Sequence, residues 1–234
     1  MLKAILFDLD GTLLPMNLRE FQITGGQLFA EKMTEYGYDY NQMMEANWAA
    51  VMAMANNDGS RTNSEAFFRT LCDIFGDKII EAFDHINSYY ANEFENVKKV
   101  CGFNPEASKT LDYLKAKGYR LVLATTPWFP AVAIEKRIRW AGIDPGIFEY
   151  YSTLDNHSYC KPKAGYYEEV LQKIDLKPED CLMVGNDATE DMAAEKLGMK
   201  VFLMTEYLEN KHNVDISKYP QGDFSDLIKY IESL

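Results

Sequence analysis

The sequence predicts an α/β fold: a doubly wound parallel sheet with a smaller all-helical domain. Short apolar runs with almost no alternation are typical of strands buried on both faces, and they occur near the amino terminus and again over residues 121–204. Helix-length patterns separate the later runs, which indicates strand–helix–strand crossovers. Residues 15–100 break this alternation, because they contain successive helix-length patterns and no convincing strand.

The expected strands are the four apolar runs at residues 4–7, 121–124, 181–184 and 201–204. Polar residues follow each run at once. Because the carboxyl ends of parallel strands meet at one edge of the sheet, these polar residues are expected to form the ligand site. Crossover helices are expected at residues 104–117, 131–140, 163–174 and 187–197, and a terminal helix at residues 225–233.

The inserted segment is predicted to form helices at residues 20–36, 41–55, 64–75 and 78–94. Its clearest internal loop is the turn-rich stretch at residues 56–61. These patterns divide the chain into an α/β core, residues 1–14 and 101–234, and a helical domain, residues 15–100. The chain is expected to pass between the two domains near residues 14–17 and 100–104.

Composition excludes several classes of protein. The 234 residues are 47% apolar or aromatic and carry 24 basic and 36 acidic side chains, a net charge of −12. No basic run is longer than a pair, so neither nucleic acid nor an anionic membrane is an expected partner. An anionic ligand would need a local positive potential, supplied by a cation, by helix N-termini or by a placed lysine. The four cysteines form no C-x-x-C pair, and no secretory signal or stretch of about 18 apolar residues occurs, so a cytoplasmic location is expected.

The first strand runs into the sequence FDLDGTL, residues 7–13. On an extended chain Asp8 and Asp10 share a face, so both carboxylates can address one ligand, while Gly11 permits a sharp turn. A strand exit followed by a turn or a helix cap is the alternative explanation.

This motif resembles the first motif of the haloacid dehalogenase superfamily, an apolar strand followed by D-x-D-G-T. The resemblance implies a Rossmann-like core in which Asp8 is the nucleophile and Asp10 is the general acid and base. The presence of the second acid favours phosphoryl chemistry over carbon–halogen cleavage.

Two further motifs follow in the family's order. Thr125 closes the second strand and matches a motif whose hydroxyl binds a phosphoryl oxygen; Thr126, the other expected substrate-binding residue here, stands where many members have Asn. Lys161, directly before a proline, resembles the third motif and would offset the charge of the carboxylates and phosphoryl oxygens, with Lys163 as the competing candidate. Taken singly, a strand ending in Thr and a Lys-Pro at a helix entry are ordinary structural features.

The sequence MVGNDATED, residues 183–191, resembles the fourth motif, an apolar strand followed by a Gly and a pair of acids. Asp187 and Asp191 lie on one face of a first helical turn if a helix begins at Asp187. The chain has Gly-Asn-Asp where many members have Gly-Asp, so the division of labour among Asn186, Asp187 and Asp191 stays open. Helix capping is the alternative role for these acids.

Magnesium is the cofactor that the resemblance implies. This ion prefers hard oxygen ligands and keeps several waters. The expected ligands are Asp8, Asp187 and Asp191 and the backbone carbonyl of Asp10. A bound cation would also attract an anionic substrate to an acidic protein.

The resemblance therefore implies a magnesium-dependent phosphatase, a phosphoric monoester hydrolase acting on a small phosphorylated metabolite through an aspartyl-phosphate, as a monomer or homodimer. The helical domain would be a cap that closes over the substrate. Arg61, on the turn-rich loop, is a candidate to reach the cleft and bind substrate, although loop arginines are commonly just exposed. A phosphomutase of the β-phosphoglucomutase type and a phospho-ligand-binding protein without turnover are the alternative functions.

Overall fold

A six-stranded parallel sheet forms the centre of the computed structural model, which describes residues 1–234. The strand order is β3-β2-β1-β4-β5-β6, and every neighbouring pair is parallel. The strands are β1 (Ala4–Phe7), β2 (Arg120–Leu123), β3 (Tyr150–Tyr151), β4 (Cys181–Gly185), β5 (Lys200–Met204) and β6 (Gln221–Gly222). The four predicted strands are confirmed. The edge strands β3 and β6 were not predicted, because two residues are too few for a hydrophobic pattern.

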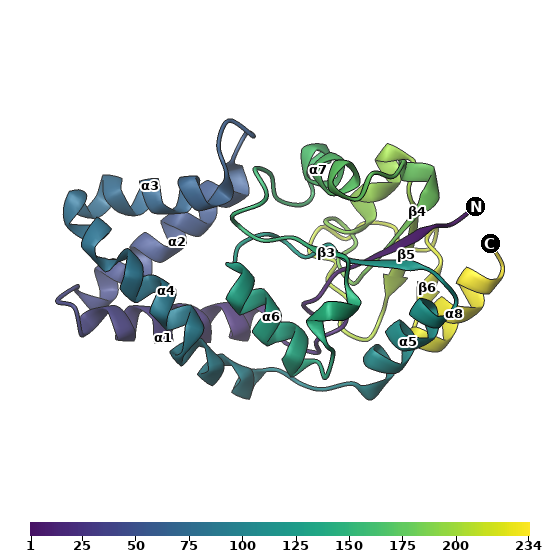
Figure 1. Ribbon diagram of the computed structural model, residues 1–234, viewed down its shortest axis with the longest axis horizontal. Helices are drawn as coiled ribbons and strands as arrows, with labels where there is room; N and C mark the ends of the chain where they lie inside the picture. Colours follow the sequence, from purple (N-terminus) through teal and green to yellow (C-terminus); the bar gives the residue numbers. More distant parts are fainter.

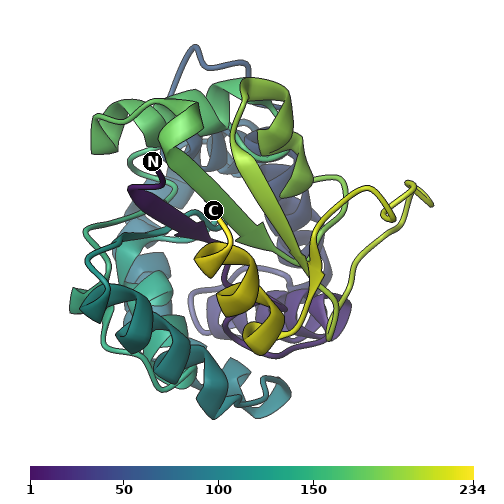
Figure 2. The same ribbon diagram turned by 90° about the vertical axis from the view of Figure 1, so that its right-hand side faces the viewer.

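Helices cover both faces of this sheet (Figures 1 and 2). The side chains of Ile5 and Phe7 pack with α5 (Pro105–Ala116), α6 (Ala131–Trp140) and α8 (Phe224–Glu232). Ala4 and Leu6, which point to the opposite face, pack with α7 (Ala164–Ile174) and the 3-10 helix η5 (Met192–Leu197). The predicted doubly wound α/β architecture is therefore confirmed, and each strand is apolar throughout because both of its faces are buried.

The intervening part of the chain, called here the helical segment (residues 18–100), contains no strand and lies to one side of the sheet (Figure 1). Its elements are α1 (Leu18–Thr34), α2 (Tyr40–Asn56), α3 (Asn63–Phe75), η1 (Asp77–Ala82), α4 (Phe83–Ala91) and η2 (Glu93–Val100). Helix α3 begins at Asn63 because Thr62 and Glu65 form a reciprocal capping box. None of the helices in the protein is both long and apolar enough to cross a membrane.

Two predicted helices have a different form in the structure. The helix expected at residues 78–94 is divided into η1, α4 and η2; Asn92 ends α4 while its side-chain amide donates to the carbonyl and hydroxyl of Ser88. The helix expected at residues 187–197 is a series of turns followed by η5, because the carboxylate of Asp187 caps a turn. The motif residues therefore lie in a turn rather than along a helix face.

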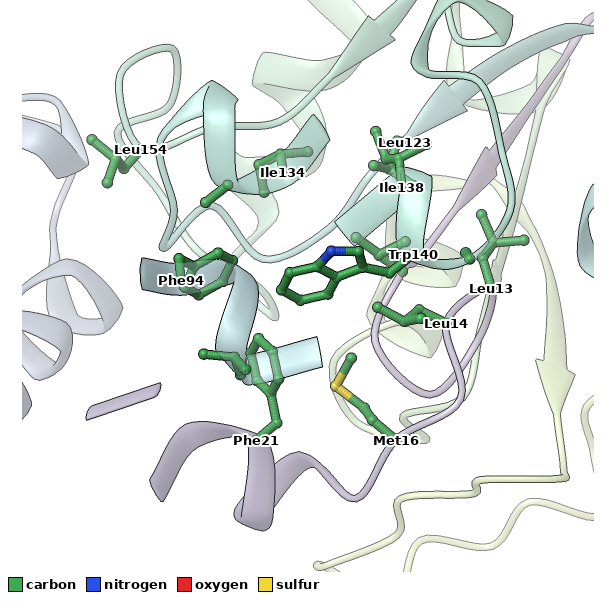
Figure 3. Packing of buried hydrophobic residues seen from close by; sticks show 14 of the residues in the cluster. Leu13, Leu14, Met16, Phe21, Phe94, Leu123, Ile134, Ile138, Trp140 and Leu154 are labelled. Atoms are coloured by element: carbon green, nitrogen blue, oxygen red, sulfur yellow. The ribbon is translucent and has the colours of Figure 1, made fainter. Parts of the chain in front are cut away.

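The helical segment and the sheet share one apolar core (Figure 3). The ring of Phe94 in η2 stacks on Trp140 of α6 with 5.4 Å between centroids, and the Trp140 indole donates to Glu95 at 2.9 Å. Phe21 of α1 packs edge-on against Phe129, in the loop after β2. Burial of each such side chain contributes about 1.5–3 kcal/mol, so these contacts hold α1 and η2 beside the carboxyl edge of the sheet.

Candidate active site

The first strand places two carboxylates at the carboxyl edge of the sheet. Asp8 directly follows β1, its backbone N–H donates to the carbonyl of Val184 at 2.9 Å, and its side chain is buried. The chain then turns at Gly11, whose φ of +79° favours glycine. A side chain at this position would also collide with the amide of Asn186. The tight turn keeps Asp10 close to Asp8.

Lys161 joins the first and fourth motifs. Its ammonium lies 2.8 Å from Oδ1 of Asp8 and 2.6 Å from Oδ1 of Asp191, and all three side chains are buried. Burial opposes the charge of Lys161, but Asp191 and Asp8 raise its pKa well above the ordinary value. Burial raises the pKa of Asp191 to about 7 and also raises that of Asp8, against the opposing effect of Lys161. One cation thus compensates two acids where water does not screen them.

The three residues of the fourth motif have different partners. Asn186 uses both ends of its amide, accepting from the Thr12 hydroxyl at 2.9 Å and donating to the carbonyl of Tyr207 at 2.7 Å. The second oxygen of Asp191 accepts from the backbone N–H of Asp187 at 2.9 Å. Oδ1 of Asp187 accepts from two backbone N–H groups of its own turn, and its Oδ2 has no hydrogen-bond partner in the protein. Of these three residues, only Asp187 therefore keeps a carboxylate oxygen free for a ligand.

Thr125 and Thr126 follow β2 into the same region. The hydroxyl of Thr125 makes no hydrogen bond within the protein, whereas its carbonyl accepts from the Tyr166 hydroxyl at 2.9 Å. The hydroxyl of Thr126 donates to Glu190 at 3.2 Å. Burial raises the pKa of Glu190 to about 7, an effect that Lys161 opposes. Of the two threonines, Thr125 has the free hydroxyl.

These residues surround one cavity of about 570 Å³, called here the catalytic cavity. The side chains of Asp8, Asp10 and Thr125 line it, as do those of Asp187 and Asp191. Lys161 does not line the cavity itself but bonds to Asp8, which does. The remaining lining residues are Leu18, Phe21, Gln22, Thr126, Trp128, Phe129, Asn186, Glu190 and Glu209. The structure thus brings together most of the residues that the four motifs predict.

Arg137 is the main member of the site that the sequence analysis missed. Its Nη1 donates to both carboxylate oxygens of Asp10, at 2.8 and 2.6 Å, and the arginine is completely buried. Its guanidinium stacks over the ring of Phe129, with Cζ 4.4 Å from the centroid. The signal in the sequence was an arginine on the apolar face of a helix, three residues after Ile134 and next to Ile138.

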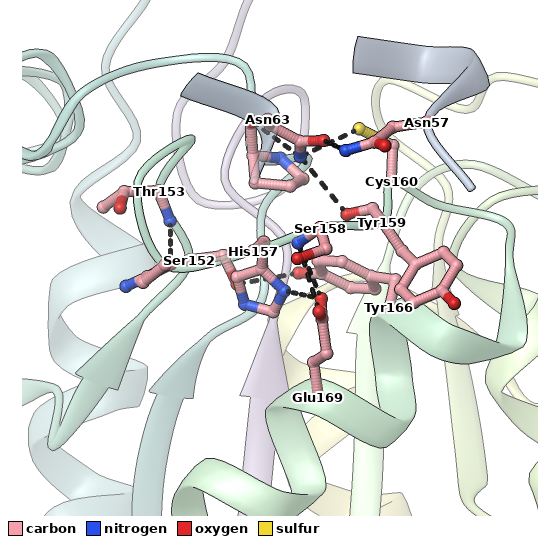
Figure 4. Close-up of polar contacts among 12 residues, drawn as sticks. Asn57, Asn63, Ser152, Thr153, His157, Ser158, Tyr159, Cys160, Tyr166 and Glu169 are labelled. Atoms are coloured by element: carbon pink, nitrogen blue, oxygen red, sulfur yellow. Dashed lines mark hydrogen bonds and ion pairs between the residues drawn. The ribbon is translucent and has the colours of Figure 1, made fainter. Parts of the chain in front are cut away.

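Arg61 does not reach the catalytic cavity. It lines a separate surface cavity with Asp58, Arg69 and Asp73. The loop that carries Arg61 is held by Asn63, which is fully buried. The amide of Asn63 is within 3.4–3.5 Å of three acceptors in the core, the carbonyls of residues 127 and 159 and the sulfur of residue 160 (Figure 4).

A model of the haloacid dehalogenase-like hydrolase family matches residues 2–198. The chain therefore belongs to this family, and the predicted family and enzyme class, a hydrolase, are confirmed.

Curated relatives cover the chain almost completely. A glyceraldehyde 3-phosphate phosphatase from Methanothermobacter thermautotrophicus is 29% identical over 93% of this chain and 92% of its own length. The pyrophosphatase PpaX from Bacillus cereus is 23% identical and covers 100% of this chain and 98% of its own length. Among solved structures, the putative hydrolase YfnB from Bacillus subtilis, in a magnesium-bound form, has a TM-score of 0.58 at 16% identity, with 98% of each chain covered. This last likeness shows the shared fold.

Proposed function

We propose that this protein is a magnesium-dependent phosphatase that hydrolyses a small phosphorylated metabolite through an aspartyl-phosphate at Asp8. One observation carries the proposal: buried Lys161 bridges Asp8 and Asp191 at 2.8 and 2.6 Å, with Asp10 in the same cavity. A carboxylate nucleophile, a fixed cation and a second carboxyl group are the parts that phosphoryl transfer to a carboxylate requires. The phosphatase names of the curated relatives support the same class of reaction.

The carboxylates of the cavity suit magnesium. Asp8 has one oxygen not bonded to Lys161, and Oδ2 of Asp187 has no protein partner. No group of three or more His, Cys, Asp or Glu side chains is arranged to hold a metal by itself. Magnesium typically binds one or two carboxylates and keeps waters and phosphate oxygens as its other ligands. We therefore assign it to Asp8, Asp187 and the backbone carbonyl of Asp10, where it would neutralise phosphoryl charge.

Asp191 has a different role in this proposal. Both of its oxygens already accept from protein donors, the Lys161 ammonium and the backbone N–H of Asp187. It thereby fixes Lys161 against the nucleophile and Asp187 in its turn. We propose that Asp191 positions these two residues.

Asp8 forms the new bond to phosphorus while the bond from phosphorus to the ester oxygen breaks. Asp10 gives its proton to that oxygen, the free hydroxyl of Thr125 binds a phosphoryl oxygen, and Lys161, 2.8 Å from Asp8, offsets the negative charge at the nucleophile. Asp10 then takes a proton from a water molecule, which attacks phosphorus and releases phosphate and the Asp8 carboxylate. Arg137 fixes the orientation of the Asp10 carboxyl throughout.

We also assign residues 1–14 and 101–234 as the catalytic core and residues 15–100 as its cap. The two connections between these parts lie side by side: Met16 and Cys101 form an antiparallel bridge, and the backbone N–H of Gly102 donates to the carbonyl of Pro15 at 2.6 Å. Paired connections of this kind allow the cap to move as one body.

The test is phosphate release from a panel of phosphorylated sugars, nucleotides and small acids, with and without Mg²⁺. The expected result is release that requires Mg²⁺ and is absent in Asp8→Asn, while the variant keeps the wild-type melting temperature. Full activity of Asp8→Asn would refute the proposal. Ligand binding without release would favour the binding-protein alternative, and transfer of the phosphoryl group to another position of a sugar would favour the phosphomutase.

A further inference from the structure

A second cavity, called here the apolar cavity, adjoins the catalytic cavity and belongs mostly to the helical segment. Ten of its fourteen lining residues are hydrophobic, as is typical of small-molecule sites. Its lining residues are Phe21, Gln22, Gly25, Gly26, Phe29, Asn47, Trp48, Val51, Phe67, Tyr89, Tyr90, Phe94, Trp128 and Phe129. Phe21, Gln22, Trp128 and Phe129 line both cavities, so the two lie side by side at the carboxyl edge of the sheet.

The apolar cavity contains no charged side chain. No lysine, arginine or histidine lines either cavity, and the acids Glu190 and Glu209 line the catalytic one. A second phosphate or a carboxylate on the leaving group would therefore lack a cation and meet like charge. The leaving group that fits this surface is uncharged and apolar.

Two side-chain amides give the apolar cavity a limited polar character. Gln22 lies where the two cavities meet, and Asn47 lies deeper, next to Gly26. Neither amide makes a hydrogen bond within the protein, and both side chains are partly exposed. They are available to bind a single hydroxyl or ether oxygen of the ligand.

Gly25 keeps one side of the apolar cavity open. It lies in the middle of α1, where glycine is less favourable than alanine by about 1 kcal/mol. A Cβ built at Gly25 meets no atom within 4 Å, so no neighbouring atom requires glycine there. Gly25 is itself a lining residue of the apolar cavity, so a large side chain at this position has room to extend along it.

We propose that the apolar cavity binds the leaving group of the substrate, and that the substrate is a phosphomonoester of an uncharged, apolar alcohol. This inference rests on the proposed function, because it assigns a substrate class to the same reaction. Aromatic rings from α1, α4, η2 and the loop after β2 surround the leaving group; Phe21 and Phe94 are among them (Figure 3). The phosphoryl group is bound in the catalytic cavity.

The experiment compares benzyl phosphate, ethyl phosphate and pyrophosphate in the wild type, Gly25→Leu and the control Gln27→Leu. Benzyl and ethyl phosphate both release an alcohol, so the size of the apolar group is the main difference between them. In the wild type, kcat/KM for benzyl phosphate should exceed that for the other two by about tenfold or more. Gly25→Leu fills the cavity, so the benzyl-to-ethyl ratio should fall by about tenfold or more. The control Gln27→Leu should leave this ratio unchanged, because Gln27 is exposed on the same helix and lines neither cavity.

The outcomes separate the two proposals. If pyrophosphate is the best of the three substrates, or if Gly25→Leu keeps the wild-type ratio, the apolar cavity does not bind the leaving group, although the phosphatase proposal stands. If these three compounds release no phosphate while a member of the sugar, nucleotide and small-acid panel does so in an Asp8-dependent manner, only the inference about the leaving group fails. If no compound of either set releases phosphate in an Asp8-dependent manner, the phosphatase proposal itself fails. Melting temperatures verify that both leucine variants are folded. Gly25→Ala places a smaller side chain at the same position of the apolar cavity.

Discussion

The two adjoining cavities differ in almost every physical property. The catalytic cavity contains four aspartates at the ends of two strands, compensated by the buried cations of Lys161 and Arg137. The apolar cavity contains aromatic rings from helices and no charge. Together the two proposals separate reaction from recognition: residues at the ends of the strands supply the charged groups, and the apolar cavity supplies the shape of the site.

The largest effect is expected from a substitution beside the catalytic cavity, at Lys161. Lys161→Met removes the only cation between Asp8 and Asp191 and leaves two buried acids without a compensating charge. Breaking a buried ion pair in this way costs about 3–5 kcal/mol of folding stability. Turnover should fall by about 10³-fold or more, because the phosphoryl charge also loses its partner. Urea unfolding and phosphate release measure the two effects, and near-wild-type values for Lys161→Met would contradict the network described here.

Lys161 and Arg137 also show what the sequence can and cannot predict. The four long strands were predicted because each is a continuous apolar run, and the polar residues after them share one edge for purely topological reasons. Lys161 was found because its motif is local. Arg137 was missed because its partner Asp10 is 127 positions away, and nothing near either residue indicates the pairing.

The apolar cavity could not be predicted from the sequence for a related reason. Its residues come from several helices and the loop after β2, and each of their local patterns indicates only an ordinary buried face. Arg61 was expected in the cleft because it is a cation on a loop. Its actual place depends on Asn63, whose buried contacts with residues 127, 159 and 160 could not be inferred from a loop sequence.

The next prediction tests whether Arg137 acts through Asp10. Arg137→Leu removes both hydrogen bonds to the Asp10 carboxylate, so kcat should fall by about 10²-fold, the lower range for losing general acid–base catalysis. KM should change little, because Arg137 does not line the catalytic cavity. Arg137→Lys restores a cation and should recover part of kcat. Equal loss in both variants, matched by an equal loss of melting temperature, would indicate a purely structural role.

The smallest effect is expected from a substitution that places a charge in the apolar cavity. Asn47→Lys introduces a cation into the apolar cavity from α2, at a side chain that has no hydrogen-bond partner in the protein. The ratio of kcat/KM for pyrophosphate to that for benzyl phosphate should rise by about tenfold, because one favourable charge contact is worth about 1.4 kcal/mol. Asn47→Gln serves as the control. An unchanged ratio in Asn47→Lys would show that the leaving group does not lie near α2.

The most direct test of the central claim is the intact mass of Asp10→Asn after incubation with Mg²⁺ and acetyl phosphate. The leaving acetate of this compound needs no proton, so Asp8 should still be phosphorylated, whereas hydrolysis lacks its general base. We expect a gain of one phosphoryl group, mapped to Asp8 and absent from the double variant Asp8→Asn/Asp10→Asn. An active wild type combined with no adduct in Asp10→Asn, or an adduct on another residue, would contradict it.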